Sequence, residues 1–315
     1  MHAPDTPSQP PVILIVGPTA SGKSSASLAL AHLLGGEIVS ADSRQVYRYM
    51  DIGTAKPLPS EREEVPHWGL DVVDPDERYS AGRYAEEARG WISEIRKRGR
   101  AVIVVGGSGL YLEALVEGFF SGADTKDDDL RMELEKRADQ EGLDILYKEL
   151  ITLDPVYAEK TRKNDRQRIL RALEVSLVAE EPFSSLHERK RSAAGFKTLW
   201  FGLEHNRKSL YERIDCRVGE MLNRGLVREV RGLLDRGYRD ANALKSVGYK
   251  EVIDWYESRL PSLEEVREAI EKNTRRYAKR QLTWFRRYPQ LSWLDGSASS
   301  ESLAKDIQLE YESSF

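Results

Sequence analysis

The chain has 315 residues, of which 40% are hydrophobic, enough for one large or two ordinary domains with a buried core. The single cysteine, Cys216, excludes a disulfide framework and any Cys-rich metal site, as is typical of proteins from the reducing cytosol. A formal net charge of −4 argues against a protein that coats nucleic acid, although basic residues can still gather locally.

The first residues are not expected to form a targeting segment. Residues 1–11 contain four prolines and lack the basic-then-apolar pattern of a signal peptide, which predicts a disordered leader. No run in the sequence approaches the roughly 20 apolar residues that cross a bilayer. We therefore expect a cytoplasmic monomer without a membrane partner.

Short apolar runs alternate with helical segments in the first third of the chain. Residues 12–16, 37–40 and 101–105 are the runs, and their length and composition are typical of strands buried on both faces of a parallel sheet. Helices are expected over residues 22–34 and 81–98. This alternation predicts an α/β fold with a parallel sheet and flanking helices.

The character of the sequence changes after Gly118. A polar break is followed by a charged stretch of helical periodicity, which predicts a helical insertion domain over residues 121–195. The core is then expected in residues 12–120 and 196–290, followed by a C-terminal tail at 291–315. The second part of the core is expected to contain one strand and four amphipathic helices, at residues 197–203, 208–222, 226–236, 250–259 and 263–287.

A phosphate-binding pattern follows the first predicted strand. Residues 17–24 (GPTASGKS) match G-x-x-x-x-G-K-[ST] between a buried strand and a helix. The glycines let backbone N–H groups surround an anion, Lys23 supplies a positive charge, and Ser24 can coordinate Mg²⁺. The pattern predicts a P-loop NTPase-like sheet with a diphosphate or triphosphate site. Its expected members are Gly17, Thr19, Ala20, Ser21, Gly22, Lys23 and Ser24.

This phosphate loop lacks its usual acidic partner. P-loop kinases and NTPases carry a metal-holding acid at the end of a later strand, whereas residues 101–105 are followed by Gly106-Gly107-Ser108-Gly109. Asp42 instead follows the second predicted strand, at the edge of the sheet where α/β proteins bind ligands. A carboxylate there can accept a proton. The alternative role for Asp42 is a turn or helix cap.

Six motifs in chain order carry a resemblance to a known family. They are DSRQVY at 42–47, IGTAKP at 52–57, GGSGLY at 106–111, NDRQRILRALE at 164–174, ALKSVGYKE at 243–251 and TRRYAKRQLTWFRR at 274–287. Together they closely resemble the tRNA dimethylallyltransferases, over roughly residues 12–290. Two departures stand out: Ser108 replaces the usual threonine, and residues 67–71 (HWGLD) replace the usual paired histidines.

The resemblance implies transfer of a dimethylallyl group from dimethylallyl diphosphate to N6 of the adenine directly 3′ of the anticodon. A carboxylate such as Asp42 is a sensible general base for this weakly nucleophilic amine. Lys23, Arg217 and an Mg²⁺ ion on Ser24 would stabilise the diphosphate leaving group. Ser108 joins the catalytic residues by resemblance, although neither serine has a neighbouring base that would make it a nucleophile.

The resemblance also implies a path for the tRNA anticodon stem-loop. Gln45 could read a base edge, and Arg131, Arg168, Arg171 and Lys250 could meet phosphates. Residues 160–171 and 271–287 are locally basic, although a solvated helix face is the alternative explanation. The implied contact residues are Asp42, Ser43, Arg44, Gln45, Ser108, Arg131, Gln167, Arg168, Ile169, Leu170, Arg171, Lys245, Ser246, Val247, Gly248, Tyr249 and Lys250.

Three other functions compete with this interpretation. An adenylate isopentenyltransferase would act on free AMP, ADP or ATP, a P-loop kinase would transfer a phosphoryl group, and an RNA-binding module would catalyse nothing. The expected helical insertion favours an RNA substrate over a free nucleotide. Isolated histidines such as His205 are expected to be structural. Tyr277 and Phe285 fit core positions of the last helix better than stacking platforms.

Overall fold

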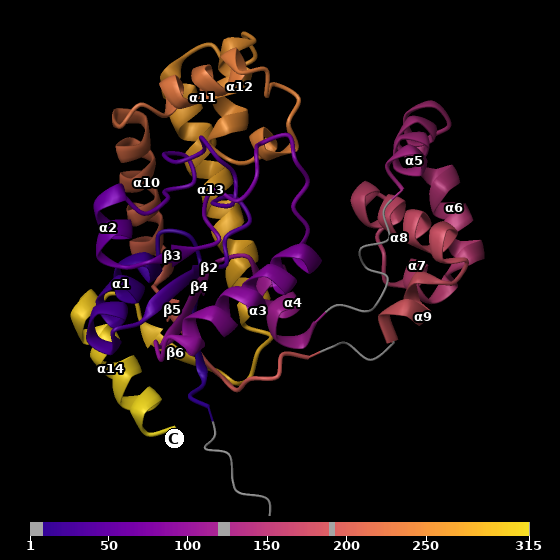
Figure 1. The fold of residues 1–315 in the computed structure, drawn as a ribbon. Helices are drawn as coiled ribbons and strands as arrows, with labels where there is room; N and C mark the ends of the chain where they lie inside the picture. Colours follow the sequence, from indigo (N-terminus) through magenta and orange to yellow (C-terminus); the bar gives the residue numbers. More distant parts are fainter. Residues whose placement is uncertain (1–8, 119–126, 189–192, 315) are drawn as a thin grey trace, which may run out of the picture. The chain divides into compact units, whose positions relative to one another are not determined.

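The structure is a computed structural model, and it describes residues 9–118, 127–188 and 193–314 (Figure 1). Most of the expected leader lies outside these residues. Gln9 and Pro10 are described, and both accept hydrogen bonds from the guanidinium group of Arg96. Among the described residues, no helix is both long and apolar enough to cross a membrane.

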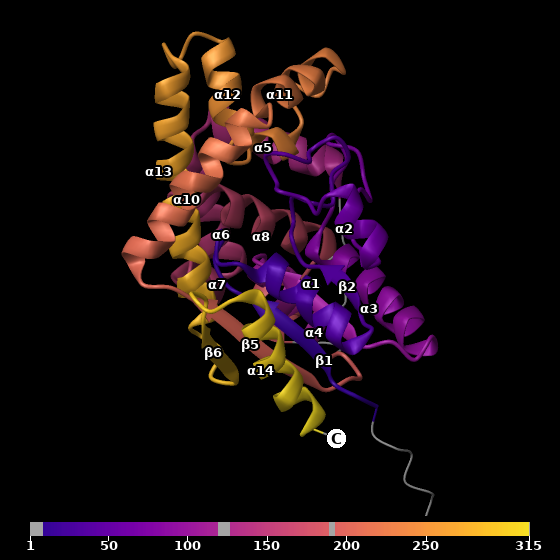
Figure 2. The ribbon, with the colours of Figure 1, turned by 90° about the vertical axis from the view of Figure 1, so that its left-hand side faces the viewer.

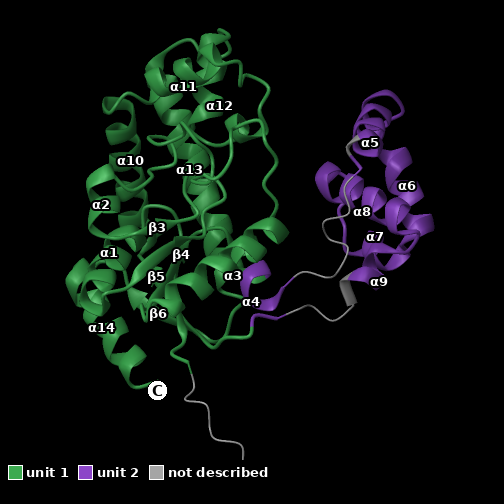
Figure 3. Ribbon diagram, viewed as in Figure 1, with its two compact units in different colours: residues 1–113, 195–315 green, residues 114–194 purple. Residues whose placement is uncertain are grey.

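The chain forms two units, coloured separately in Figure 3. The first unit comprises residues 1–113 and 195–315, and the second comprises residues 114–194. The expected insertion, residues 121–195, therefore corresponds closely to the second unit.

The first unit is built on a parallel sheet. Its described residues form six strands, in the order β3-β2-β4-β1-β5-β6, and all neighbours pair in parallel. The α/β fold predicted from the sequence is confirmed, with strand ends shifted by at most a residue. The strands are β1 (Val12–Val16), β2 (Glu37–Ser40), β3 (His67–Trp68), β4 (Val102–Gly106), β5 (Thr198–Glu204) and β6 (Leu291–Asp295).

Both faces of the sheet are covered, which explains the continuous apolar runs of its central strands. Every residue of β1 is buried. On one face, α1 (Lys23–Leu34) and α14 (Ser300–Glu312) pack together against side chains that include Ile13, Ile15 and Phe201 (Figure 2). Separately, α3 (Ala81–Lys97) packs against β2 and β4.

The end of the chain corrects one expectation from the sequence. Residues 291–315, expected as a tail, contain β6 at the edge of the sheet and α14 on its face. Leu303, Ala304 and Ile307 of α14 are buried in the same apolar cluster as α1. The C-terminal segment is therefore part of the core.

The remaining helices of the first unit include several that pack on one another. Long helices α10 and α13 pack against each other, and α12 packs against both α11 and α13. These elements are α2 (Pro59–Glu64), α4 (Gly109–Glu117, which continues into the second unit), α10 (Arg207–Asn223), α11 (Leu226–Asp235), the 3₁₀ turn η1 (Asn242–Lys245), α12 (Tyr249–Tyr256) and α13 (Leu263–Phe285).

The second unit is helical and has its own core. Leu146, Leu150, Ile169 and Leu173 are fully buried in one apolar cluster. Aspartate side chains cap three of its helices, as expected for N-cap positions. Its helices are α5 (Asp128–Gln140), α6 (Leu143–Leu153), α7 (Pro155–Glu159), α8 (Arg166–Ala179) and α9 (Phe183–Glu188).

Candidate functional site

The phosphate loop follows β1 and leads into α1. Gly17 and Gly22 both have positive φ angles, of 141° and 92°, which glycine adopts readily. A Cβ atom on Gly17 would also lie 2.8 Å from the carbonyl oxygen of Leu203 in the neighbouring strand. The loop geometry therefore depends on glycine at position 17, as the motif predicts.

Three side chains from distant parts of the first unit hold this loop. Gln281 of α13 accepts a hydrogen bond from the Thr19 N–H (2.8 Å) and donates one to the Gly107 carbonyl (2.9 Å). His205 lies 3.0 Å from the Ser21 carbonyl through Nε2. Arg213 donates from Nε to the Ala20 carbonyl at 2.7 Å. His205 is thus structural, as expected from the sequence.

Gln281 was not identified individually from the sequence. It is buried, and a Cβ on Gly107 would lie 2.1 Å from its Nε2 atom, so the second glycine of GGSGLY makes room for it. A signal did exist: Gln281 is a polar residue between Ala278 and Phe285 on the buried face of α13. A polar side chain in such an apolar stripe needs a buried partner.

Lys23 is the first residue of α1, and it forms no ion pair with an acidic side chain among the described residues. Its Nζ donates to the Pro18 carbonyl at 2.5 Å and lies 3.4 Å from Ser21 Oγ. Burial, together with the positive charge of Arg217, lowers the pKa of Lys23 to about 7, although the Asp42 carboxylate partly opposes both effects. A bound anion would favour the charged form of this lysine.

Arg217 and Asp42 are the other charged residues that the sequence analysis assigned to catalysis. Burial lowers the pKa of Arg217, and the nearby Asp42 carboxylate opposes that shift. Asp42 accepts a hydrogen bond from the Arg44 N–H (2.9 Å) through Oδ1. This bond to the N–H group two residues later is the kind expected of a turn residue, the alternative role for Asp42. The other carboxylate oxygen has no hydrogen bond with the described residues.

Lys23, Asp42 and Arg217 line one cavity of about 320 Å³. The cavity is bounded by the phosphate loop, by segments that follow β2 and β4, and by residues of α10, α12 and α13. Other lining residues expected from the sequence are Thr19, Ser24, Ser43, Arg44, Gln45, Lys245, Ser246, Val247, Gly248 and Tyr249; lining residues not expected include Gly53, Thr54, Ala55, Thr274, Tyr277, Arg280 and Gln281.

Tyr277 differs from its expected core position because it lines the cavity, whereas Phe285 is fully buried as expected. Burial and the nearby Asp42 carboxylate together raise the pKa of Tyr277 to about 12. Ser108 lies at the rim of this group: its Oγ accepts a hydrogen bond from the Ser43 N–H at 2.8 Å. Ser108 therefore fixes the backbone next to Asp42.

A magnesium ion fits the donor set only in part. Ser24 and Asp42 both line the cavity and offer the oxygen atoms that Mg²⁺ prefers. No group of three or more His, Cys, Asp or Glu side chains that could hold a metal occurs in the part of the chain that the structure describes. An ion on Ser24 would thus need oxygens from a bound diphosphate and from water.

Gln45 is engaged within the protein. Its Oε1 accepts from Ser40 Oγ (2.9 Å), and its Nε2 donates to the carbonyls of Thr54 (3.3 Å) and Ala55 (3.2 Å). Both ends of the amide are used, so reading a base edge with this side chain would require breaking these bonds. The amide instead ties the end of β2 to the IGTAKP segment.

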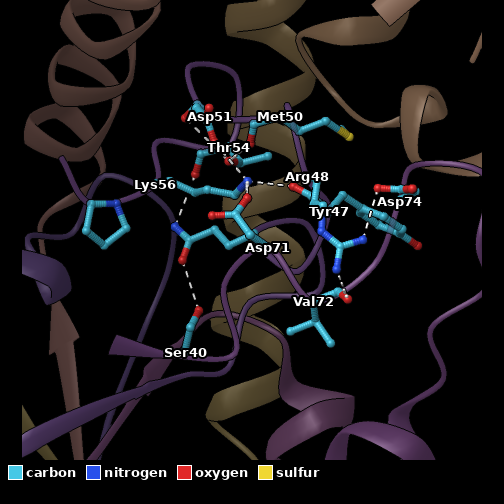
Figure 4. Close-up of polar contacts among 12 residues, drawn as sticks. Ser40, Tyr47, Arg48, Met50, Asp51, Thr54, Lys56, Asp71, Val72 and Asp74 are labelled. Carbon is cyan, nitrogen blue, oxygen red and sulfur yellow. Dashed lines mark hydrogen bonds and ion pairs between the residues drawn. The ribbon is translucent and has the colours of Figure 1, made fainter. Parts of the chain in front are cut away.

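Lys56 organises the same segment (Figure 4). Its side chain is completely buried, and Nζ donates to the Tyr47 carbonyl (2.5 Å), Asp51 Oδ1 (2.9 Å) and Asp71 Oδ1 (2.6 Å). Arg62 pairs with the second oxygen of Asp71 at 2.8 Å. A buried ammonium group with three oxygen partners is satisfied, and it fixes the path of the loop.

The remaining tRNA residues expected from the sequence lie in different environments. Lys250 is exposed and pairs with Asp254. In the second unit, Gln167 and Arg168 are exposed, and Arg168 lies 3.4 Å from Asp165. Arg131 and Arg171 both pair with the buried carboxylate of Glu174.

Ile169 and Leu170 require a correction. Both are expected to contact tRNA, yet both side chains have no exposed surface and pack in the core of the second unit. They occupy the inner face of α8, whose outer face carries Gln167 and Arg168. A contact between these two apolar side chains and RNA therefore does not fit the structure.

Comparisons with known proteins identify the family of this chain. The family model for IPP transferases matches residues 45–288. A tRNA dimethylallyltransferase from Carboxydothermus hydrogenoformans is 44% identical over 298 residues, which cover 94% of this chain and 96% of the relative. One from Geobacter sulfurreducens is 46% identical over 295 residues, which cover 93% and 94%.

Solved structures give the same result. The full-length tRNA isopentenylpyrophosphate transferase from Bacillus halodurans matches with a TM-score of 0.70 and 37% identity, covering 96% of this chain and 97% of that one. A eukaryotic dimethylallyltransferase acting on tRNA matches with a TM-score of 0.78 and 31% identity, covering 90% and 73%. With its family match, its relatives and its fold in agreement, the chain belongs to the IPP transferase family.

Proposed function

We propose that this protein transfers a dimethylallyl group from dimethylallyl diphosphate to N6 of the adenine directly 3′ of a tRNA anticodon. The observation that carries the proposal is the cavity that holds Lys23, Arg217 and Asp42 together beside the phosphate loop. The similar proteins from Carboxydothermus hydrogenoformans and Geobacter sulfurreducens are tRNA dimethylallyltransferases, which supports tRNA as the acceptor. Lys23, Arg217 and the N–H groups of the phosphate loop can bind a diphosphate, and the Asp42 carboxylate can accept a proton.

The chemistry follows from the charges that develop in the transition state. As N6 bonds to the first carbon of the dimethylallyl group, the bond from that carbon to the diphosphate oxygen breaks, and the oxygen keeps the electron pair. Lys23 and Arg217 stabilise this negative charge in the proposed mechanism, and their common position in the cavity lining supports that role. Asp42 takes the proton that N6 releases, and the products are the alkylated base and diphosphate.

Mg²⁺ is the cofactor in this proposal, and it would be held by Ser24. When bound, it supplies further positive charge for the diphosphate. The described residues that line the cavity belong to the first unit, and we propose that the protein acts as a monomer.

An RNA substrate is favoured over a free nucleotide because the chain carries a whole unit that the cavity does not need. The second unit presents exposed basic and polar residues such as Arg168 and Gln167 on α8. Anticodon loops also present unpaired bases, which can enter a pocket at low cost in stacking energy.

The deciding experiment is mass spectrometry of nucleosides after incubation with dimethylallyl diphosphate, Mg²⁺ and unmodified tRNA. N6-isopentenyladenosine at the adenine 3′ of the anticodon is the expected product. Parallel reactions offer AMP in place of tRNA, and radiolabelled ATP without the prenyl donor. Prenylated AMP alone would indicate the free-nucleotide enzyme, and transferred phosphate would indicate a kinase; either result would overturn the proposal.

A further inference from the structure

The IGTAKP segment was singled out from the sequence, and the reaction described above gives it no role. In the structure, Gly53, Thr54 and Ala55 of this segment form part of the cavity wall. Lys56 and Gln45 hold its far end, through the buried ammonium group and the side-chain amide described above. Its near end is held by a residue from an entirely different part of the chain, Glu229.

Glu229 lies on α11 and accepts four hydrogen bonds. Oε2 accepts from the N–H groups of Asp51 (2.9 Å) and Ile52 (2.7 Å). Oε1 accepts from the Gly53 N–H (3.1 Å) and from the Tyr249 hydroxyl (2.6 Å). Three consecutive N–H groups that converge on one carboxylate form an anion-binding arrangement of the backbone, and here a side chain of the same protein occupies it.

This carboxylate joins two pieces of the cavity wall. Gly53 and Tyr249 both line the cavity, and a Cβ on Gly53 would lie 2.5 Å from the Tyr249 ring. The backbone therefore touches the ring directly. Burial beside Glu229 raises the pKa of Tyr249 well above its ordinary value, so the hydroxyl keeps its proton and its hydrogen bond.

The donor side of the cavity is held by other residues. Gln281, His205 and Arg213 fix the phosphate loop, and none of them contacts residues 51–53 in the hydrogen bonds of the described chain. A change at Glu229 should therefore move the wall formed by Gly53 and Tyr249 and leave the diphosphate site in place. We infer that Glu229 is a positioning residue that sets this wall for the acceptor adenine, an inference that rests on the proposed function.

The test variant is Glu229→Gln, which keeps the size of the side chain. An amide has one acceptor oxygen, and its NH₂ group would face N–H donors, so at least part of the four-bond arrangement must break. Lys56 and Gln45 still hold the far end of the loop, so a shift is expected and not unfolding. A misplacement of about 1 Å can lower a rate by about 10²-fold.

Glu37 offers a matched control in the same unit. It is a buried carboxylate at the start of β2 that accepts from Trp68 Nε1 (2.8 Å) and pairs with Arg98 (2.8 Å), and it does not line the cavity. Glu37→Gln reports the general cost of losing a buried carboxylate. Both variants are compared with the wild type for thermal stability, for kcat and KM with tRNA, and for KM with dimethylallyl diphosphate.

The wild type must first form the prenylated nucleoside, and its failure to do so would overturn the proposed function rather than this inference. With an active wild type, Glu229→Gln should lower kcat/KM for tRNA by about 10²-fold, with the donor KM unchanged. Glu37→Gln should lower stability without that loss. Equal tRNA kinetics in the two variants, or a donor KM that rises with Glu229→Gln, would overturn the inference.

Tyr249→Phe provides a second test that does not depend on how Glu229→Gln folds. It removes only the hydroxyl that binds Glu229 and leaves the ring against Gly53. We expect a smaller loss of kcat/KM for tRNA in the same direction, and a double variant no worse than Glu229→Gln alone, because both changes act on one arrangement. Fully additive losses would show that the two residues act separately.

Discussion

Two cationic side chains of the cavity and the arginines of the second unit are arranged in opposite ways. In the first unit, Lys23 and Arg217 line the cavity and form no ion pair within the described residues. In the second unit, Arg131 and Arg171 converge on the buried Glu174, and Arg137 pairs with both Glu141 and Glu149. The charge of the first pair is offset only in part, by the nearby Asp42 carboxylate, whereas the second set has its charge balanced within the protein.

This difference indicates which cationic side chains would be stabilised most by a bound anion. Burial disfavours the charged form of both Lys23 and Arg217, so an incoming anion would stabilise each of these charges. The paired arginines gain less from an RNA phosphate, because binding it would mean sharing or giving up a carboxylate partner. We therefore expect substitutions in the cavity to have large effects on the reaction rate and on donor binding. Substitutions in the second unit should change the affinity for RNA only slightly.

The largest effect is expected for Asp42→Ala. Loss of a general base typically lowers the chemical step by about 10²–10⁴-fold. Removing a negative charge next to Lys23 and Arg217 should not weaken diphosphate binding, so inhibition by inorganic diphosphate should stay at least as strong. Single-turnover rates with saturating tRNA measure the step, and Asp42→Asn serves as the isosteric control. Wild-type rates in both variants would reduce Asp42 to a turn residue.

Lys23→Ala should weaken binding of dimethylallyl diphosphate and slow transfer. A hydrogen bond to a charged partner contributes about 1.5–3 kcal/mol, which corresponds to a loss in affinity of tenfold or more. The affinity for tRNA should be preserved, since the second unit is untouched. Isothermal titration with inorganic diphosphate measures the first effect, and an unchanged dissociation constant would place the donor elsewhere.

The pH dependence of donor binding gives a more specific test of the same lysine. Its pKa is about 7 in the free protein, and a bound diphosphate would raise it. Below pH 7 Lys23 is already protonated in the free protein. Above pH 7 Lys23 must take up a proton when diphosphate binds, so the affinity for diphosphate should fall by up to tenfold per pH unit.

Lys23→Arg is the control, because a guanidinium group stays protonated over this range. Ionisation of the diphosphate itself affects both proteins equally, so the ratio of their dissociation constants isolates the lysine. That ratio should change between about pH 6 and pH 9. A constant ratio would contradict the depressed pKa of Lys23.

Local patterns in the sequence were enough to predict the central strands and the phosphate loop. Residues 12–16 have no polar position and lead directly into GPTASGKS, so both the strand and the loop follow from neighbouring residues. By contrast, β3 has only two residues, and β6 (LSWLD) mixes polar and apolar positions at the sheet edge. Such short or edge strands depend on the partner they pair with, and that partner is far away in the sequence.

The site was predicted only as far as its motifs extend. Gln281 reaches a loop that lies 262 residues away, and Glu229 reaches one 176 residues away, so neither contact leaves a local pattern. Ile169 and Leu170 show the opposite error. They were assigned to RNA together with the whole motif, although helical periodicity places both on the apolar side of α8 with Leu173.

The smallest effect is expected in the second unit, from Arg168→Gln. Arg168 is largely exposed and has only a loose contact with Asp165, at 3.4 Å, so its charge is available to a phosphate. Each lost contact with single-stranded RNA should reduce the slope of log affinity against log salt by about 0.7. Donor binding should not change.

Arg171→Gln is the matched comparison, since Arg171 lies one turn along the same helix but pairs with the buried Glu174 at 3.1 Å. Its loss leaves Glu174 with Arg131 at 3.5 Å, so thermal stability should fall more than the salt slope changes. Affinities for the anticodon stem-loop across a salt series, together with melting temperatures, separate the two outcomes. If Arg171→Gln flattened the slope as much as Arg168→Gln at equal stability, pairing with a carboxylate would not decide which arginines meet RNA, and the contrast between the two units would fail.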